Sequence, residues 1–189
     1  MSFTADFLAQ MGAVLAEIDV AMLDRAAEVL AKVRAAEGRL FVLGVGGSAA
    51  IASHAVIDLR KACGFEAYAP TESTAELTAR TNDEGWDSVF TGWLRGSRLR
   101  AGDGLLIFSV GGGDKEKGVS VNIVEAIDLA IEVGASVVGV VGKATGYTAR
   151  HADAAVIVPQ LFPARSGPLT LAAASVIEKL LILHPSLQR

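Results

Sequence analysis

LFVLGVGGS (residues 40–48) and LLIFSVGGG (residues 105–113) are two apolar strands that each end in a glycine-rich turn. The first turn leads directly into a helix that Ser48 would cap, whereas the helix after the second turn is delayed until Ser120. Glycine lets the backbone approach a ligand, and the N-terminus of a helix favours a negative charge. Together the two turns predict a binding site for a phosphorylated small molecule.

The expected phosphate donors are backbone N–H groups and serine hydroxyls in these turns. They are Gly46, Gly47, Ser48, Ser109, Gly111, Gly112 and Ser120, and the amides of residues 47–50 would converge on one point. Each serine also has a purely structural interpretation. Ser48 and Ser120 could do no more than cap their own helices, and Ser109 could be no more than a polar strand end. Because the pattern occurs after two strands, ligand binding is favoured for the first turn.

Outside the two turns, short apolar runs alternate with segments of helical periodicity. Strands are expected at residues 40–44, 66–69, 105–109, 136–141 and 154–158, and helices at residues 48–63, 73–81, 86–95, 120–133, 147–152 and 169–183. This alternation is typical of an α/β protein in which helices cover both faces of a parallel sheet. The length of 189 residues fits a single domain, residues 1–189.

The N-terminal region is expected to be helical and to associate with other chains. Apolar residues recur at helical spacing over residues 7–36, and Asp19 is positioned to cap a second helix. The interpretation is a helical hairpin over about residues 3–36, or one bent helix. Since its apolar stripe exceeds what a core of this size needs to bury, we predict self-association through helices.

Composition excludes several classes of function. A net charge of −4 and a pI near 5.4 do not favour a nucleic-acid or membrane-surface partner. The start of the sequence lacks a secretion signal, and no apolar run approaches the ~20 residues that span a bilayer, so a cytoplasmic protein is expected. Cys63 is the only cysteine, which excludes an intrachain disulfide and a cysteine-based metal cluster.

The helix expected after Ser48 carries a candidate pair for proton transfer. His54 and Asp58 are four residues apart and share a face, with Lys61 on the same side. An imidazole titrates near neutral pH, and burial can raise the pKa of a carboxyl group toward the same range. The alternative is a solvated pair on an exposed helix face.

Asn82 and Asp83 are candidates to contact sugar hydroxyls at the mouth of the sheet. Asp83 could instead cap the helix that carries Trp86 and Phe90. The sequence leaves both interpretations open.

A nicotinamide-dependent oxidoreductase is an alternative function. Gly44, Gly46 and Ala49 match the dinucleotide fingerprint G-x-G-x-x-A after a strand, and Glu66 lies near the expected position of a ribose-binding acid. Against this alternative, the second glycine-rich turn is not required by such an enzyme, and the chain lacks the length for a second domain.

Several motifs together resemble those of the SIS (sugar isomerase) domain family. They are GVGGS at residues 44–48 with His54 and Asp58 downstream, TNDEGW at residues 81–86, Gly102-Asp103 before the second strand, and SVNI at residues 120–123. Within this family the chain resembles the phosphoheptose isomerases, which convert sedoheptulose 7-phosphate to a heptose 7-phosphate. The resemblance implies a five-stranded parallel sheet in a three-layer α/β/α sandwich, assembled as a homotetramer with active sites at subunit contacts.

The resemblance also implies roles for individual residues. Ser48, Ser109 and Ser120 would hold the phosphate, and Asn82 and Asp83 would contact the sugar. Asp58 stands where the family has its glutamate base, and His54 matches a histidine that binds zinc in many members.

The chain departs from the family pattern at three places. Val45 replaces an asparagine of the first turn, and the second turn is reduced to Val110 and three glycines. The last helix of the family supplies a glutamine or glutamate and then a histidine, but residues 165–179 contain no histidine. Ser175 or Lys179 takes its place, depending on the register, and a lysine there would supply positive charge without a metal.

We therefore expect that the zinc site is lost, with His54 as its remnant and Glu178 pointing away, and that no cofactor is bound. The predicted function is isomerisation of sedoheptulose 7-phosphate, with Asp58 as base and His54 as proton carrier or electrophile. The alternative is a non-catalytic sugar-phosphate-binding or regulatory protein of the same family.

Overall fold

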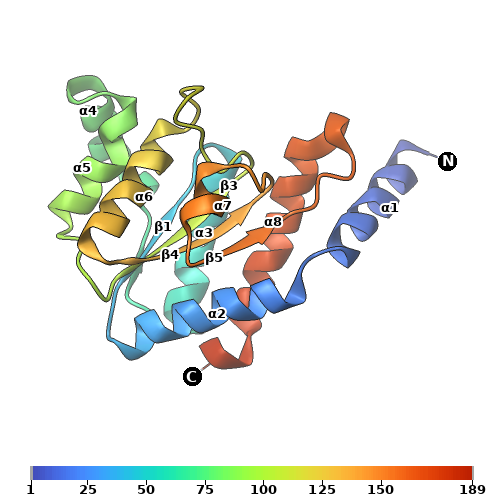
Figure 1. The fold of residues 1–189 in the computed structure, drawn as a ribbon, viewed down its shortest axis with the longest axis horizontal. Helices are drawn as coiled ribbons and strands as arrows, with labels where there is room; N and C mark the ends of the chain where they lie inside the picture. Colours follow the sequence, from blue (N-terminus) through green and yellow to red (C-terminus); the bar gives the residue numbers. More distant parts are fainter. Residues whose placement is uncertain (1, 189) are drawn as a thin grey trace.

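The computed structural model describes residues 2–188, which form a parallel five-stranded sheet between two layers of helices (Figure 1). The strands are β1 (Leu40–Leu43), β2 (Ala67–Tyr68), β3 (Gly104–Ser109), β4 (Ser136–Val141) and β5 (Ala154–Ile157). The helices are α1 (Phe3–Ala16), α2 (Val20–Ala35), α3 (Gly47–Lys61), α4 (Thr74–Asp83), α5 (Val89–Gly96), α6 (Val121–Val133), α7 (Tyr147–His151) and α8 (Ser166–Leu183). Short 3₁₀ turns are η1 (Pro70–Glu72), η2 (Trp86–Ser88), η3 (Pro163–Arg165) and η4 (Pro185–Leu187). The predicted three-layer α/β/α architecture is confirmed.

The strand order is β2-β1-β3-β4-β5, so the order reverses between β1 and β3. These two strands pair directly, with Leu43 opposite Ile107 at their carboxyl ends. The chain then continues into α3 after β1 and, through a loop, into α6 after β3, and these helices cover opposite faces of the sheet. In parallel α/β sheets a crevice opens at such a reversal and receives ligands.

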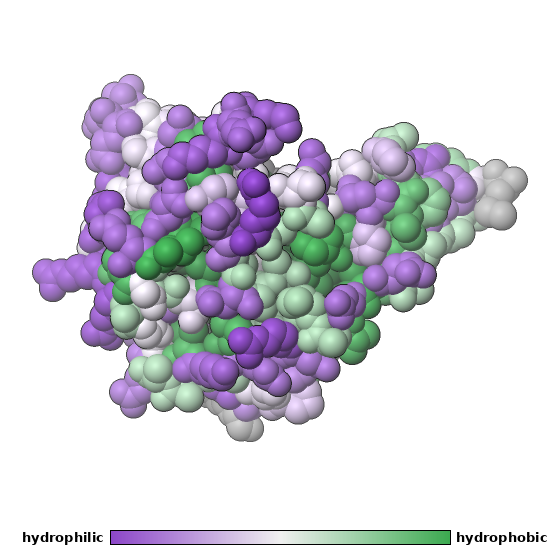
Figure 2. Space-filling view, viewed as in Figure 1, coloured by the Kyte–Doolittle hydropathy of each residue, from purple (hydrophilic) through white to green (hydrophobic). Residues whose placement is uncertain are grey.

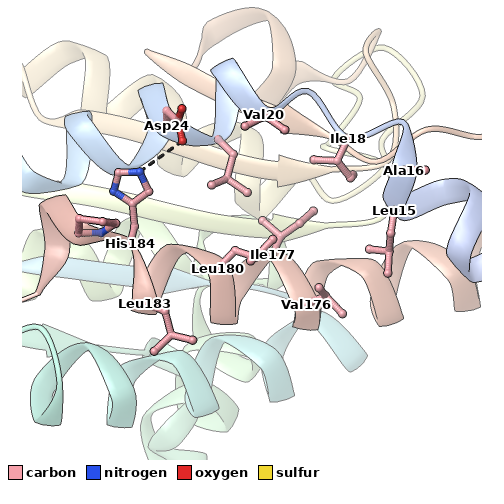
Figure 3. Close-up of a pocket in the computed structure, with 12 residues that line it drawn as sticks. Leu15, Ala16, Ile18, Val20, Asp24, Val176, Ile177, Leu180, Leu183 and His184 are labelled. Carbon is pink, nitrogen blue, oxygen red and sulfur yellow. Dashed lines mark hydrogen bonds and ion pairs between the residues drawn. The ribbon is translucent and has the colours of Figure 1, made fainter.

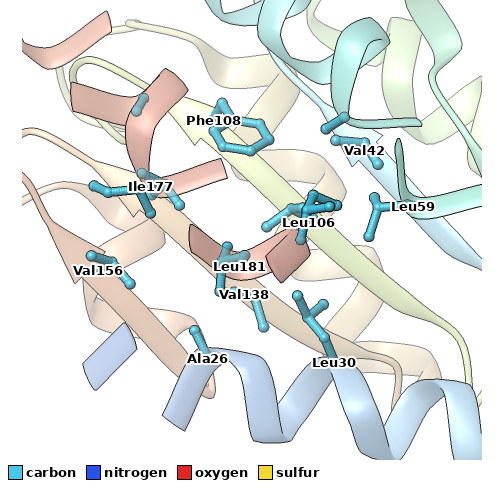
Figure 4. Close-up of a cluster of buried hydrophobic side chains, with 14 of the residues drawn as sticks. Ala26, Leu30, Val42, Leu59, Leu106, Phe108, Val138, Val156, Ile177 and Leu181 are labelled. Carbon is cyan, nitrogen blue, oxygen red and sulfur yellow. The ribbon is translucent and has the colours of Figure 1, made fainter. Parts of the chain in front are cut away.

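Alternation along the strands builds a core on each face. On one face Val42, Leu106 and Phe108 pack with residues of α2, α3 and α8 (Figure 4). On the other face Phe41, Leu105 and Ile107 pack against α5 and α6. Because both faces are covered, the strands are continuous apolar runs, as expected for a buried parallel sheet.

Asp103 fixes the amino-terminal edge of the sheet. Its fully buried carboxylate accepts hydrogen bonds from the backbone N–H groups of Arg39 (2.9 Å) and Arg100 (3.1 Å). It also forms an ion pair of 2.7 Å with the Arg39 guanidinium, and this hydrogen bond raises the pKa of Arg39. The starts of β1 and β3 are thereby held side by side.

Helices α1 and α2 follow each other across a bend at residues 17–19, so the predicted hairpin is not formed and the arrangement agrees with the alternative of a bent helix (Figure 1). Asp19 caps α2 as expected, since its carboxylate accepts a hydrogen bond of 3.0 Å from the Met22 N–H. Helix α2 lies along β4 and β5, whereas α1 contacts α8 and extends away from the body of the molecule (Figure 1). Val14 is the buried residue of α1, so most of this helix lacks cover.

Helix α8 contradicts the expectation that no apolar run approaches the length that spans a bilayer. The segment Pro163–Leu183 is long and apolar enough to span a bilayer by length and composition. In the structure, however, Leu169, Ala173 and Ile177 are buried in the core, where α8 packs against α3 and β4. A core helix satisfies the same criteria as a membrane span, and burial accounts for the apolar residues on the core side of α8, whereas Val176, Leu180 and Leu183 are exposed.

Candidate functional site

The two glycine-rich turns follow adjacent strands at the carboxyl edge of the sheet, as predicted. The first turn requires glycine, since a Cβ on Gly44 would lie 2.4 Å from the backbone carbonyl carbon of Ser48, and Gly46 has a φ of +62°. Because β1 and β3 are neighbours, the start of α3 and the loop before α6 lie at the same edge of the sheet, where parallel α/β proteins bind ligands.

The first turn differs in detail from the prediction. Gly46, not Ser48, is the N-cap residue of α3, and the side chain of Ser48 is buried in the first turn of the helix. The N–H of Ser48 donates to the Val45 carbonyl at 3.2 Å, and those of Ala49 and Ala50 donate to the Gly46 carbonyl at 3.0 and 3.3 Å. Of the four amides expected to converge, the Gly47 N–H has no backbone acceptor within residues 2–188.

The second turn is held by hydrogen bonds within itself and to Thr148. The Ser109 hydroxyl accepts a hydrogen bond of 3.0 Å from the Gly112 N–H, so this amide is already engaged. The Gly112 carbonyl in turn accepts from the N–H and the hydroxyl of Thr148, both at 2.8 Å. Ser109 therefore shapes the turn, which favours its structural interpretation, while Gly111 is half-buried.

Ser120 begins α6 as expected, but in a strained conformation. Its φ of +49° is in the left-handed region, which costs a non-glycine residue about 1–2 kcal/mol, and its side chain makes no capping hydrogen bond. Next to it the fully buried Asn122 accepts from the Ile123 N–H at 2.9 Å, whereas its Nδ2 has no partner in the described chain. Asn122 belongs to the SVNI motif but was not among the predicted site residues; its position in the first turn of an expected helix was the available signal.

His54 and Asp58 of α3 meet Glu178 and Lys179 of α8. The His54 Nδ1 lies 3.8 Å from a carboxylate oxygen of Asp58 and 3.8 Å from one of Glu178. The Lys179 ammonium lies 3.2 Å from His54 Nδ1 and 3.1 Å from Glu178 Oε2, and it donates a hydrogen bond to Asp58. The Glu178 side chain is 3% exposed, whereas those of His54 and Lys179 are 55% and 46% exposed. We call these four residues the His54 cluster.

The pKa of Asp58 in the His54 cluster is not raised as expected for a buried acid. The hydrogen bond from Lys179 lowers the pKa of Asp58, although partial burial acts in the opposite direction. Burial also acts to lower the pKa of Lys179, but its hydrogen bonds to Asp58 and Glu178 outweigh this, and the pKa of Lys179 is raised. At neutral pH the pair is therefore a carboxylate and an ammonium.

Two expectations about α8 are resolved by this arrangement. Glu178 was expected to point away, but it faces the His54 cluster from a buried position. Of the two candidates for the missing histidine, Lys179 reaches the cluster, whereas the Ser175 hydroxyl donates to the Leu171 carbonyl of its own helix at 3.2 Å.

Asn82 and Asp83 lie apart from the cluster. They form the exposed end of α4, where the Asn82 amide donates to Asp83 at 2.7 Å, and α4 packs against η1, η2 and α5. Asp83 caps no helix, because Gly85 precedes η2 and Ser88 precedes α5. Within residues 2–188 neither side chain forms a hydrogen bond or ion pair with the His54 cluster, and Lys61 lies exposed at the end of α3.

Glu66 argues against a dinucleotide site. It precedes β2 and therefore lies at the amino-terminal edge of the sheet, beside Arg39 and Arg98. A ribose-binding acid is needed at the carboxyl edge, where the glycine-rich turn holds the pyrophosphate. The nicotinamide alternative is therefore wrong in assigning Glu66 to the ribose.

Comparisons with known proteins address the family directly. A family model described as "SIS domain" matches residues 4–142. The phosphoheptose isomerase of Rhodospirillum rubrum is 34% identical over 144 residues, which are 74% of this chain and 72% of that protein. The probable phosphoheptose isomerase of Thermoplasma volcanium is 32% identical over 148 residues, 75% of this chain and 71% of that protein.

A solved structure agrees with these relatives. Phosphoheptose isomerase GmhA from Neisseria gonorrhoeae is similar with a TM-score of 0.78 and 28% identity, over 94% of this chain and 96% of that one. A phosphoheptose isomerase from Francisella tularensis has the same fold, with a TM-score of 0.79 at 21% identity. Because the family model spans most of the sequence and the relatives extend over about three quarters of it, the chain belongs to the SIS domain family.

Proposed function

We propose that this protein is a sugar-phosphate isomerase of the phosphoheptose isomerase type, which interconverts the ketose sedoheptulose 7-phosphate and an aldose. The observation that carries the proposal is the His54 cluster, in which a carboxylate, an imidazole and an ammonium meet on α3 and α8. Aldose–ketose isomerisation moves a proton between adjacent carbons and needs a donor for the oxygen that becomes negative. The cluster contains groups of both kinds.

The spacing along α3 supports a sugar phosphate of this length. Gly47 and His54 are seven residues apart, so they share a face of α3 and are separated by about 10.5 Å along its axis. An extended seven-carbon chain spans roughly 7 Å at about 1.2 Å per bond, and its phosphoester adds roughly 3 Å. A phosphate at the start of α3 would thus leave the carbonyl end of the sugar beside His54.

In the proposed reaction Asp58 accepts the proton from the carbon next to the carbonyl group and returns it to the former carbonyl carbon. Its ion pair with Lys179 keeps the carboxylate ionised and able to accept. His54, which is exposed toward the solvent, carries protons between the sugar oxygens. The direct test is to follow sedoheptulose 7-phosphate by nuclear magnetic resonance with the purified protein, where appearance of the aldose is expected.

A second candidate is a sugar-phosphate-binding protein without catalysis. The lowered pKa of Asp58 favours it, because a weaker base gives less driving force for proton abstraction. Saturable binding of sedoheptulose 7-phosphate with no turnover would establish this alternative, and the absence of both would refute each candidate.

For the phosphate site we propose the starts of α3 and α6. The left-handed Ser120 and the unpaired, buried Asn122 Nδ2 support an anion beside α6. Ser120→Ala is expected to raise the Kd for sedoheptulose 7-phosphate about 10-fold, since it removes a hydrogen bond to a charged group, and to leave kcat nearly unchanged. Calorimetric titration measures the Kd, and Ser175→Ala, which removes an exposed hydroxyl of α8, is the control. Unchanged affinity in Ser120→Ala would remove Ser120 from the site.

We also propose that the protein is a cytoplasmic homotetramer. Helices α1, α2 and α8 border an apolar groove of about 490 Å³ (Figure 3). Val20, Leu180 and Leu183 in this groove are 68%, 48% and 68% exposed. Figure 2 shows apolar surface along the projecting α1 and at its base. Large exposed apolar surfaces are typical of protein contacts, and a second copy of this chain would cover both the groove and α1.

Association through the groove can be weakened by one charge. The wild-type protein is expected to sediment as a multiple of its 19.6 kDa chain mass. Leu183→Glu is expected to weaken association at least about 10-fold, because an unpaired carboxylate is costly to bury at an apolar contact. Ile131→Glu on α6 places the same charge at an exposed apolar residue outside the groove and should change nothing. A wild-type monomer at every concentration would contradict the proposal.

A further inference from the structure

The His54 cluster has the composition of a metal site but already contains a positive charge. His54, Asp58 and Glu178 each offer one ligand atom, and these atoms lie within 4.8 Å of one another. Imidazole and carboxylate groups at such spacing are ordinary ligands of zinc. The ammonium of Lys179, however, contacts all three side chains.

We propose that the Lys179 ammonium is the built-in cation of this site and excludes a divalent metal ion from it. The zinc that the family resemblance implies therefore does not fit the residues present. This inference concerns the charge and ligands of the cluster, and it stands whether or not the protein turns over a sugar phosphate.

The ammonium matches the cluster in number and direction. It has three N–H donors, and it meets three acceptors: His54 Nδ1, a carboxylate oxygen of Asp58 and Glu178 Oε2. When His54 Nδ1 accepts this hydrogen bond, the neutral imidazole carries its proton on Nε2. Lys179 thus already engages one atom of each group that would bind a metal.

Burial of Glu178 makes a cation necessary. Its carboxylate is 3% exposed, and its polar contacts in residues 2–188 are with Lys179 and His54. A buried carboxylate without a positive partner is strongly destabilising. Lys179 supplies that partner through its own side chain, whose partly exposed position lets it reach the cluster from the solvent side.

A divalent ion and the ammonium cannot share the cluster. Zinc requires ligand atoms at about 2.0–2.2 Å. The ammonium lies only 3.1–3.2 Å from two of these same ligand atoms. An ion bound there would be within roughly 4 Å of a like charge, which opposes binding at any effective dielectric constant of a protein. Metal binding would require Lys179 to leave all three partners.

Metal titration of the untagged protein tests the inference. Cobalt(II) is the probe, because it replaces zinc and its absorption reports ligand geometry. The wild type is expected to show no saturable site, whereas Lys179→His is expected to bind one cobalt ion per chain through four protein ligands. The Kd of Lys179→His should be at least about 100-fold below the highest cobalt concentration at which the wild type stays unsaturated, since an imidazole replaces a repelling charge.

Two further variants make the result decisive. Lys32→His adds an imidazole at an exposed residue of α2 and is expected to behave as the wild type. Lys179→Ala opens the cluster without adding a ligand and is expected to bind cobalt with intermediate affinity, which keeps the test valid should Lys179→His fail to fold. Stoichiometric binding by the wild type that is lost in His54→Ala would overturn the inference, as would folded Lys179 variants that bind no better than the wild type.

An activity measurement separates this inference from the proposed function. If the protein is an isomerase, its turnover is expected to be the same with and without excess chelator. Loss of turnover with chelator and its recovery with zinc would overturn the exclusion of metal but leave the isomerase intact. Absence of turnover in every condition would refute the isomerase, and the cobalt titration would still decide the role of Lys179.

Discussion

Asp58→Asn is expected to lower kcat for sedoheptulose 7-phosphate by about 10²- to 10⁴-fold, the range typical for loss of a general base. The amide has nearly the same shape as the carboxylate but does not accept a proton at neutral pH. Lys179 retains Glu178 and His54 as partners, so the fold and the affinity for the sugar phosphate should change little. Steady-state kinetics and calorimetric binding on the same sample separate the two effects.

Asp87→Asn is the matched control, since this exposed aspartate of η2 lies outside the cluster and undergoes the same chemical change. It should retain full activity. An Asp58→Asn protein that keeps more than half of the wild-type kcat would show that another group takes the proton. His54 would then be the first residue to test.

Asp103→Ala is expected to be the most destabilising substitution at a polar residue. Removing one partner of a buried ion pair costs about 3–5 kcal/mol, and the lower end applies because Arg39 keeps its hydrogen bonds to the Ser97 and Arg98 carbonyls. The N–H groups of Arg39 and Arg100 also lose their acceptor. A loss of about 3 kcal/mol in a chain of this size lowers Tm by roughly 6–12 °C.

The control for this prediction is Asp153→Ala at the start of β5. Asp153 likewise accepts a strand hydrogen bond, from the Val137 N–H at 2.8 Å, but it is exposed to solvent. Its loss should cost about 0.5–1.5 kcal/mol. Thermal unfolding of both variants gives the comparison, and equal changes in Tm would mean that burial of Asp103 is not what makes it important.

The fold was predictable because its signals are local. The alternation of short apolar runs with helical periodicity predicted β4 at its observed bounds and the ends of the other strands to within one residue. Glycine-rich turns after β1 and β3 could be recognised in the same way, since close backbone approach demands glycine at positions such as Gly44. Helices α1 and α2 were both expected, but their separation was not, because it depends on contacts with α8 and the sheet.

The site was predictable only in part, because its remaining residues meet across long sequence separations. His54 and Asp58 share a helix face by spacing, whereas Glu178 and Lys179 come from a helix that is apolar on most sides. Such a helix gives no periodic signal of its rotation about its axis. The direction of the Asp58 pKa shift could not be predicted for the same reason, since the sequence offered Lys179 only as one of two candidates and did not place its ammonium against Asp58. Likewise, the use of the Ala49 and Ala50 amides within their own turn depends on backbone geometry that composition does not specify.

Helix α8 contributes neighbouring residues both to the His54 cluster and to the apolar groove. Glu178 and Lys179 face α3, while Leu180 and Leu183 line the groove with residues of α1 and α2 (Figure 3). A displacement of this helix when another chain occupies the groove would move Lys179 relative to Asp58. Association through this groove, if it occurs as proposed, would then change the ion pair that holds the proposed proton acceptor in its charged form.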